Sequence, residues 1–161
     1  MRASAQTLTL RRLPLDEARL MVAGRSTEVM RAAWHPEYPL PDTLEGLTWM
    51  LAAHEVMGGP DPASPWWSYQ LVLDGRAVGD IGFHGPLDDR QQVTIGYQVV
   101  PSAQRHGLAT AACALIVQLA WSAGARRLLA STDASNMASQ QVLRRNGFRT
   151  DDGRTFILDK P

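Results

Sequence analysis

The chain has 161 residues, of which 45% are apolar and 20% are charged, a composition typical of one soluble globular domain. Its formal net charge is zero, which argues against a protein that binds nucleic acid. No apolar run approaches the roughly 20 residues that a membrane-spanning helix needs, and residues 1–6 lack the apolar core of a signal peptide. We therefore expect a cytoplasmic protein without a membrane partner. Cys113 is the one cysteine, so the sequence offers no internal disulfide and no metal-cluster spacing, and we expect no metal.

The two halves of the chain differ in charge. Residues 1–99 carry 8 Lys or Arg and 12 Asp or Glu, a balance of −4, whereas residues 100–161 carry 8 and 4, a balance of +4. A basic C-terminal half suits a phosphate-bearing ligand, and an acidic N-terminal half suits a cationic one. Uneven surface charge without a function is the alternative.

Apolar spacing in the first half of the chain predicts one strand followed by helices. The alternation of residues 7–13 predicts a strand that Pro14 ends. Helices are predicted over residues 16–24, 27–33 and 43–57, the last one capped by Asp42 or Thr43. Loops are predicted over the proline-rich residues 35–41 and over residues 58–65.

The second half of the chain alternates between strands and helices. Strands are predicted over residues 66–73, 77–84, 92–100, 127–132, 148–150 and 155–158. Helices are predicted over residues 108–123, which Gly124 ends, and from Ser135 or Asn136 to Arg145. This order predicts an α/β (mixed α+β) fold, with a mixed sheet of six to seven strands and helices on both faces. The strands on either side of the helix at 108–123 should be parallel, because a crossover helix joins them.

Residues 104–110 form the turn between a predicted strand and the helix that follows it. The first N–H groups of a helix lack partners within the helix, and together with the helix dipole they attract an anion such as pyrophosphate. Gly107 lets the backbone approach that anion closely, because it has no Cβ. The hydroxyl of Thr110 could add a donor. The loop therefore predicts an anion-binding site.

Three segments, in order, resemble the GCN5-related N-acetyltransferase (GNAT) family, on the RimJ/RimL-like branch that includes ribosomal-protein N-terminal acetyltransferases. Residues 104–109 match the coenzyme loop (Q/R)-x-x-G-x-(G/A), residues 95–101 the strand before it, and residues 136–148 an ending in N-x-x-S and N-G-F. The resemblance covers residues 68–158, and the first 60 residues only in element order. It implies a single GNAT domain over residues 1–161, with acceptor-side helices and loops over 1–67 and an acetyl-CoA-binding core over 68–161.

The resemblance implies acetyl-CoA as the donor co-substrate and a primary amine, on a small molecule or a peptide, as the acceptor of a monomeric or homodimeric enzyme. In the family, the strand before the loop has a bulge and splays from its parallel neighbour. Its main chain, here at Val99 and Val100, would pair with the pantetheine amides. Arg105, Arg144 and Arg145 would meet the nucleotide phosphates, or else they are solvated surface residues. The coenzyme-binding residues implied are Tyr97, Val99, Val100, Gln104, Arg105, His106, Gly107, Leu108, Ala109, Thr110, Asn136, Ser139 and Arg144.

The chain departs from the family near the reacting thioester. Asn136 and Ser139 lie one helical turn apart and would face the pantetheine and the thioester; a plain N-cap and a filler residue are the alternatives. A glutamate that serves many members as general base is replaced here by Thr94. A tyrosine that serves many members as general acid is replaced by Leu143. Ser139 could then donate a proton to the leaving thiolate.

Two residues could replace the missing general base. His84 ends its predicted strand and titrates near neutral pH by default. Asp80 lies four residues earlier and therefore on the same strand face. A water chain without a single base is also possible, and a strand-end histidine without a role is the alternative for His84. The candidate catalytic residues are Ser139, Asn136 and His84.

Aromatic residues gather, with the carboxylates of Glu37, Glu45 and Glu55, in the region that builds the acceptor site in the family. Trp34, Tyr38 and Trp66 are the candidate acceptor-binding residues, because aromatic faces and carboxylates attract a cationic amine. Trp49 and Trp67 are expected in the core or over the sheet edge instead.

Two rival functions stay open at the level of sequence. A non-catalytic acyl-CoA-binding or sensor module is the main alternative, since the usual glutamate and tyrosine are missing. A nucleotide-dependent enzyme is the second, although the chain has neither G-x-G-x-x-G nor the lysine of G-x-x-x-x-G-K-[ST].

Overall fold

The computed structural model describes residues 6–59 and 61–161. Residues 1–5, at the end where no signal peptide was predicted, and Pro60, in the predicted loop over 58–65, lie outside the described residues. The strands are β1 (Leu8–Arg12), β2 (Ser68–Leu73), β3 (Arg76–Phe83), β4 (Gln92–Val99), β5 (Arg127–Ser131) and β6 (Thr155–Asp159). The helices are α1 (Leu15–Val22), α2 (Glu28–Ala32), α3 (Pro41–Val56), α4 (Leu108–Ser122) and α5 (Met137–Arg145), with a short 3-10 turn η1 (Pro101–Ala103) before α4.

The strands form one six-stranded sheet in the order β1-β2-β3-β4-β5-β6. All neighbours are antiparallel except β4 and β5, which are parallel and are joined by α4, as the sequence predicts. The predicted strand over 148–150 is wrong: this segment makes one isolated bridge, between Arg149 and Ile157. The chain bends directly after this segment, where Asp152 Oδ1 accepts from the N–H groups of Arg154 and Thr155, so the pairing does not extend along it.

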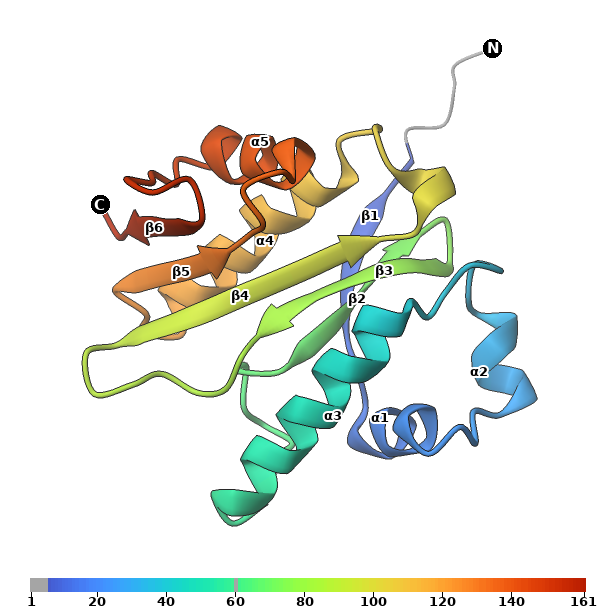
Figure 1. The fold of residues 1–161 in the computed structure, drawn as a ribbon. Helices are drawn as coiled ribbons and strands as arrows, with labels where there is room; N and C mark the ends of the chain where they lie inside the picture. The colour runs from blue at the N-terminus through green and yellow to red at the C-terminus, as the bar shows by residue number, and fades with distance from the viewer. Residues whose placement is uncertain (1–5, 60) are drawn as a thin grey trace.

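Helices cover both faces of the sheet, so the predicted fold class is confirmed (Figure 1). Helices α1 and α3 pack together on one face, whereas α4 packs against β1, β3, β4 and α5 on the other. The buried residues of α4 are Ala112, Cys113, Ile116 and Ala120, at the spacing of one helix face. Within residues 6–59 and 61–161, no helix has the length and apolarity to span a membrane.

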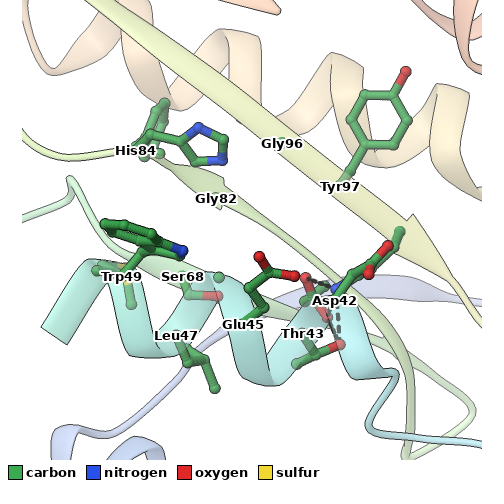
Figure 2. A pocket seen from close by; sticks show the side chains of 15 residues that line it. Asp42, Thr43, Glu45, Leu47, Trp49, Ser68, Gly82, His84, Gly96 and Tyr97 are labelled. Atoms are coloured by element: carbon green, nitrogen blue, oxygen red, sulfur yellow. Dashed lines mark hydrogen bonds between the residues drawn. The ribbon is translucent and has the colours of Figure 1, made fainter. Parts of the chain in front are cut away.

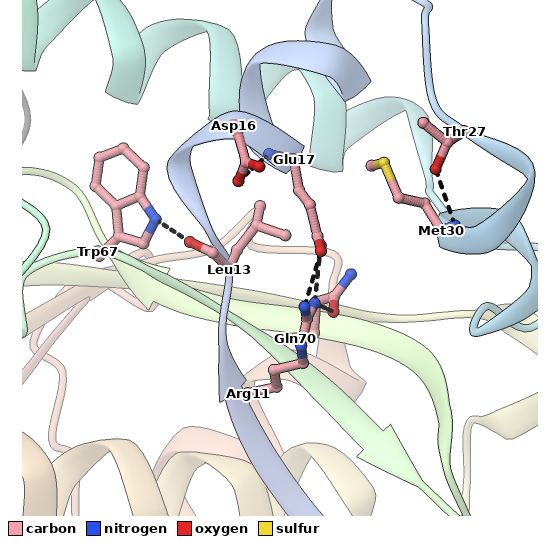
Figure 3. A network of polar contacts seen from close by, with 8 residues as sticks. All are labelled: Arg11, Leu13, Asp16, Glu17, Thr27, Met30, Trp67 and Gln70. Atoms are coloured by element: carbon pink, nitrogen blue, oxygen red, sulfur yellow. Dashed lines mark hydrogen bonds and ion pairs between the residues drawn. The ribbon is translucent and has the colours of Figure 1, made fainter.

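Polar contacts fix the first strand and helix to the sheet (Figure 3). The Trp67 indole Nε1–H donates to the main-chain oxygen of Leu13 at 2.7 Å, and Trp67 is 1% exposed, as predicted for a core residue. The Arg11 guanidinium donates to both carboxylate oxygens of Glu17 at 2.8 Å and to Gln70 Oε1 at 2.9 Å. These bonds join β1, α1 and β2 beneath helix α3.

The parallel strands β4 and β5 part soon after they begin. Their pairing runs only from Gln92 to Thr94 on β4, whereas β4 stays paired with β3 as far as Val99. The predicted splay is therefore confirmed. The bulge implied for this strand is not there, because the register of β3 with β4 is unbroken, and the irregularity lies instead between β2 and β3 at Leu71 and Val72. A strand can leave one neighbour without a bulge while it keeps register with the other.

Helix α3 begins two residues before its predicted start at residue 43. Leu40 is the N-cap and Pro41 is the first helical residue, so Asp42 and Thr43 are not caps. Proline is favoured at this position because its missing N–H would have no partner within the helix. Thr43 still ties down the start of the helix, since its Oγ1 accepts from the Leu40 N–H at 3.2 Å.

Candidate active site

The turn before α4 holds unpaired N–H groups at the start of a long helix. Gly107 is the N-cap with φ of 75°, in the left-handed region, and Arg105 has φ of 65°. The first N–H of α4 with a partner within the helix is that of Ala111, which donates to Gly107 O at 3.0 Å. The N–H groups of Leu108, Ala109 and Thr110 are therefore directed out of the helix end, as an anion site requires.

A cavity of about 860 Å³ opens in front of this turn, and we call it the loop cavity. Residues of β4, of the turn, of α5 and of the start of α3 line it. Ten of the residues that the sequence assigns to the coenzyme lie together in its wall: Tyr97, Val99, Gln104, Arg105, Gly107, Leu108, Ala109, Thr110, Asn136 and Ser139.

The remaining three residues assigned to the coenzyme lie outside the wall of the loop cavity. Val100 is fully buried, and both of its main-chain groups are used, since its N–H donates to Val78 O and its carbonyl accepts from Ala103 N–H. His106 is exposed. Arg144 lies over the ring of Phe156, 5.5 Å from its centroid, and the next residue, Arg145, lines the cavity in its place. Neighbouring side chains on a helix point about 100° apart, so of two adjacent arginines only one can face the cavity.

The main chain of β4 faces the gap at every second residue. The N–H groups of Val100 and His84 donate across the β3–β4 ladder. In an antiparallel ladder, the residues of β4 that bond to β3 alternate with residues whose main-chain groups point the other way. The main-chain groups of Tyr97 and Val99 therefore point to the side that β5 has left. The carbonyl of Val99 accepts from Gln104 Nε2 at 2.9 Å, which holds the turn against the strand.

Tyr97 and α5 meet across the gap. The Tyr97 hydroxyl donates to Ser139 O at 3.1 Å and lies 2.9 Å from Ser139 Oγ. Burial raises the pKa of Tyr97 to about 12, against a lowering effect of the Ser139 hydrogen bond, so the phenol keeps its proton at neutral pH. Asn136 is the N-cap of α5, and its Oδ1 accepts from Ser139 N–H at 3.1 Å. Leu143, at the position of the usual tyrosine, is 1% exposed and belongs to the core.

A second cavity, of about 350 Å³, lies between α3 and strands β3 and β4, and we call it the α3 cavity (Figure 2). Asp80 lies in its wall and accepts three contacts: from Thr43 Oγ1 at 2.6 Å and from Gln98 Nε2 at 3.1 and 3.2 Å. Burial raises the pKa of Asp80 to about 6, although both of these hydrogen bonds lower it. Such a carboxylate is ionised at neutral pH and still basic enough to take a proton.

His84 also lines the α3 cavity, on the same face of the sheet as Asp80. Its ring lies over Gly96 of β4, where a Cβ would stand 2.7 Å from His84 Nε2. Desolvation lowers the pKa of this histidine, although its side chain reaches the surface, so the imidazole is neutral at pH 7. The glycine is thus the residue that makes room for the imidazole.

The aromatic residues are placed differently from the prediction. Trp34, Tyr38 and Trp66 are 8%, 5% and 9% exposed and belong to the core; none of the three lines either cavity. Trp49, predicted in the core or over the sheet edge, is 72% exposed and lines the α3 cavity. Helix α3 is apolar on most of its surface, so apolar spacing does not reveal which side is buried. The buried residues of α3 are Thr43, Leu47, Met50 and His54.

The two cavities meet. Asp42, Tyr97 and Gln98 line both of them, so a ligand on the helix-α4 side can touch one on the α3 side at this point. Sequence reasoning missed Gln98 and Thr43 as site residues, whereas it names Glu45 among the carboxylates of the acceptor region. The available signal was spacing: Gln98 is two residues from Gly96 on one strand face, and Glu45 and Trp49 are one helical turn apart.

A sequence profile of the acetyltransferase (GNAT) domain matches residues 7–149. The chain belongs to the GNAT acetyltransferase family. It is 32% identical over 84 residues to the "uncharacterized N-acetyltransferase YoaA" of Bacillus subtilis (strain 168), a match covering 52% of this chain and 48% of that protein. The chain thus aligns with about half the length of this curated relative.

Solved GNAT structures share the fold over nearly the whole chain. The Mycobacterium smegmatis RimJ in complex with CoA-disulfide superposes with a TM-score of 0.62 at 21% identity, covering 94% of this chain and 81% of that one. The yncA protein of Salmonella typhimurium, described as a structure with its cofactor acetyl-CoA, gives 0.60 at 19% identity, covering 94% and 93%. At these identities the likeness shows the fold.

Proposed function

We propose that this protein transfers an acetyl group from acetyl-CoA to a primary amine, by direct attack while both substrates are bound. The observation that carries the proposal is the meeting of the two cavities at Asp42, Tyr97 and Gln98. One cavity has the helix end and open strand edge that suit a pyrophosphate and a pantetheine, and the other has an acidic wall that suits an amine. Membership of the GNAT family and the acetyl-CoA named for a solved neighbour support the choice of donor.

The loop cavity would hold the coenzyme. The N–H groups of Leu108, Ala109 and Thr110 would bind the pyrophosphate, and Arg145 from α5 would add a positive charge. The pantetheine would lie along β4, where the main-chain groups of Tyr97 and Val99 face the gap. This arrangement leaves the thioester at the junction of the two cavities.

The acceptor amine would enter from the α3 cavity and lose a proton there. Asp80 is the general base that we favour, because Gln98, which lines the junction, donates directly to its carboxylate. His84, the base suggested by the sequence, remains a second candidate, since its neutral imidazole lines the same cavity. Either group takes one proton from the ammonium and releases it later to solvent.

The neutral nitrogen would then attack the thioester carbon. The developing oxyanion would accept a hydrogen bond from Val99 N–H on the open strand edge. Collapse of the tetrahedral adduct breaks the carbon–sulfur bond, and the sulfur takes a proton from the Tyr97 phenol, which Ser139 Oγ–H supports. The nitrogen gives up its extra proton as the amide forms, and this proton returns to the Tyr97 phenolate through solvent. The products are the acetylated amine and the free thiol of CoA, with no covalent enzyme intermediate.

The test is release of CoA thiol, measured with a thiol reagent across a panel of primary amines and small peptides, with the acetylated product identified by mass spectrometry. Stoichiometric thiol and acetyl amine are the expected result. Tight binding of CoA without thiol release for any amine would favour an acyl-CoA sensor instead. Family membership alone does not identify the acceptor, so the panel includes both peptides and small molecules.

A further inference from the structure

We propose that the acceptor is a small amine that carries an aromatic or similarly bulky apolar group and no carboxylate. This inference rests on the proposed acetyl transfer and concerns the α3 cavity alone. It follows from the order of side chains along the cavity, from the exposure of Trp49, and from the charges in the wall.

The wall of the α3 cavity carries carboxylates near the junction and an exposed indole away from it. Asp42 and Thr43 at the start of α3, with Asp80 on β3, lie at the junction end. Trp49 lies at the other end of the lining stretch of α3, on the side of Ser68 and His84 (Figure 2). An amine whose nitrogen reaches the junction would therefore extend the rest of its skeleton towards the indole of Trp49.

Trp49 is the strongest sign of a ligand at this end of the cavity. Its indole is 72% exposed although it forms part of the cavity wall, whereas Trp34, Trp66 and Trp67 are all buried. Glu45 stands one turn before Trp49, so carboxylate and indole share one face of α3. A flat group stacked on the indole would remove apolar surface from water, while its ammonium stays within reach of Glu45.

The charges in the wall exclude one large class of amines. Asp42, Glu45 and Asp80 line the cavity, and among the described residues of its wall there is no lysine or arginine. A carboxylate beside the reacting amine, as in a free α-amino acid, would meet negative charge without a cationic partner. An amine without a carboxylate would only be attracted by the negative charges of the wall.

The size of the α3 cavity favours a small molecule. A volume of about 350 Å³ is at the lower end of small-molecule sites, which begin at about 300 Å³. A ring with a two-carbon spacer fits this space, whereas a long peptide would have to lie mostly outside it. A peptide N-terminus is accordingly the main competing acceptor in the test.

The experiment compares kcat/KM for matched acceptors at fixed acetyl-CoA. The probes are phenethylamine, butylamine without the ring, phenylalanine with the added carboxylate, spermidine with added cations, and a short peptide that begins with alanine. Phenethylamine should exceed butylamine by about tenfold, which corresponds to burial of the ring, and should exceed phenylalanine by about a hundredfold. Equal values for the ring and ringless amines, or preference for spermidine or the peptide, would overturn the inference.

Variants separate the indole from general effects on the fold. Trp49→Ala should lower kcat/KM for phenethylamine about tenfold and leave that for butylamine nearly unchanged, and Trp49→Phe should recover most of the loss. Val56→Ala is the control, because Val56 is 89% exposed on the same helix and does not line either cavity. If Trp49→Ala lowers both amines equally, the indole does not bind the ring. Absence of thiol release with every probe would refute acetyl transfer itself, a result distinct from transfer without ring preference.

Discussion

Tyr97 and Ser139 join β4 to α5 across the gap where β5 has turned away, with the phenol oxygen 2.9 Å from Ser139 Oγ. Leu143, the counterpart that the family resemblance suggests for a tyrosine, is buried. In the proposed mechanism strand β4 supplies the hydroxyl instead, through Tyr97. Tyr97 lines both cavities.

We predict that Tyr97→Phe lowers kcat by about 10- to 100-fold, because the leaving thiolate loses its proton donor. The KM for acetyl-CoA should change little, since the main chain of β4 and the N–H groups of α4 remain. Steady-state kinetics check both constants. Ser139→Ala removes the hydroxyl next to the phenol but leaves the proton of the phenol in place, so it should lower kcat less than Tyr97→Phe does. A Tyr97→Phe enzyme with unchanged kcat would remove the phenol from the mechanism.

The pH dependence of kcat/KM should report the ionisation of Asp80. Its pKa is raised to about 6, so activity should rise with pH through about 6 as the carboxylate forms. Thr43→Ala removes a hydrogen bond that favours the charged form, and should therefore move this limb to higher pH. Asp80→Asn should abolish the limb and most of the activity. A limb that stays in Asp80→Asn but is lost in His84→Ala would identify the histidine as the base.

Asp80 should also leave a signature in stability that is independent of activity. Its folded pKa lies above the usual 3.8, so its contribution to stability is present below that value and is lost as the pH rises through about 6. The Asp80→Asn protein should therefore melt several degrees above the natural protein at pH 8, and the difference should shrink towards pH 4. Thermal unfolding at both pH values measures this. A difference that does not depend on pH would contradict the raised pKa.

Gly96 offers a way to move His84 without removing it. A Cβ at this position would stand 2.7 Å from His84 Nε2, the far end of a side chain that can rotate away. Gly96→Ala should thus fold, keep its KM for acetyl-CoA, and raise the KM for the amine severalfold if the imidazole contacts the acceptor. The double variant Gly96→Ala/His84→Ala restores the space and is the control. Equal acceptor KM values in all of these proteins would leave His84 without a role in binding.

The sequence predicts the fold well because its signals are local. The turn at residues 104–110 and the helix after it follow from Gly107 and from apolar spacing, and the parallel pair follows from the crossover. The start of α3 was misplaced because Pro41 ends a proline-rich stretch and also opens a helix. Local rules do not decide between these two uses of proline.

The candidate site is less predictable because it depends on which way side chains point in three dimensions. The sequence favours a core or sheet-edge position for Trp49 and a site position for Trp34, yet Trp49 is 72% exposed and Trp34 is 8% exposed. Whether a tryptophan is buried or exposed depends on which face of the apolar helix α3 packs against the sheet. Tertiary contacts decide this, and the local sequence pattern does not show it. The contact of Thr43 with Asp80 and Gln98 joins residues far apart in the chain, so no spacing rule reveals it.

Arg144 and Arg145 provide a matched test of the coenzyme side. Arg145 lines the loop cavity, whereas Arg144 lies over the Phe156 ring and donates to Gln140 Oε1 at 3.3 Å. Arg145→Ala should raise the KM for acetyl-CoA about tenfold, because a charge-assisted bond to phosphate is lost, and should weaken its dependence on salt. Arg144→Ala removes the same charge one residue away and should leave that KM within about twofold, with only a small loss of stability. Since net charge changes equally in both proteins, any difference between them must come from the position of the guanidinium. Equal effects would mean that the coenzyme senses only the general positive charge of α5.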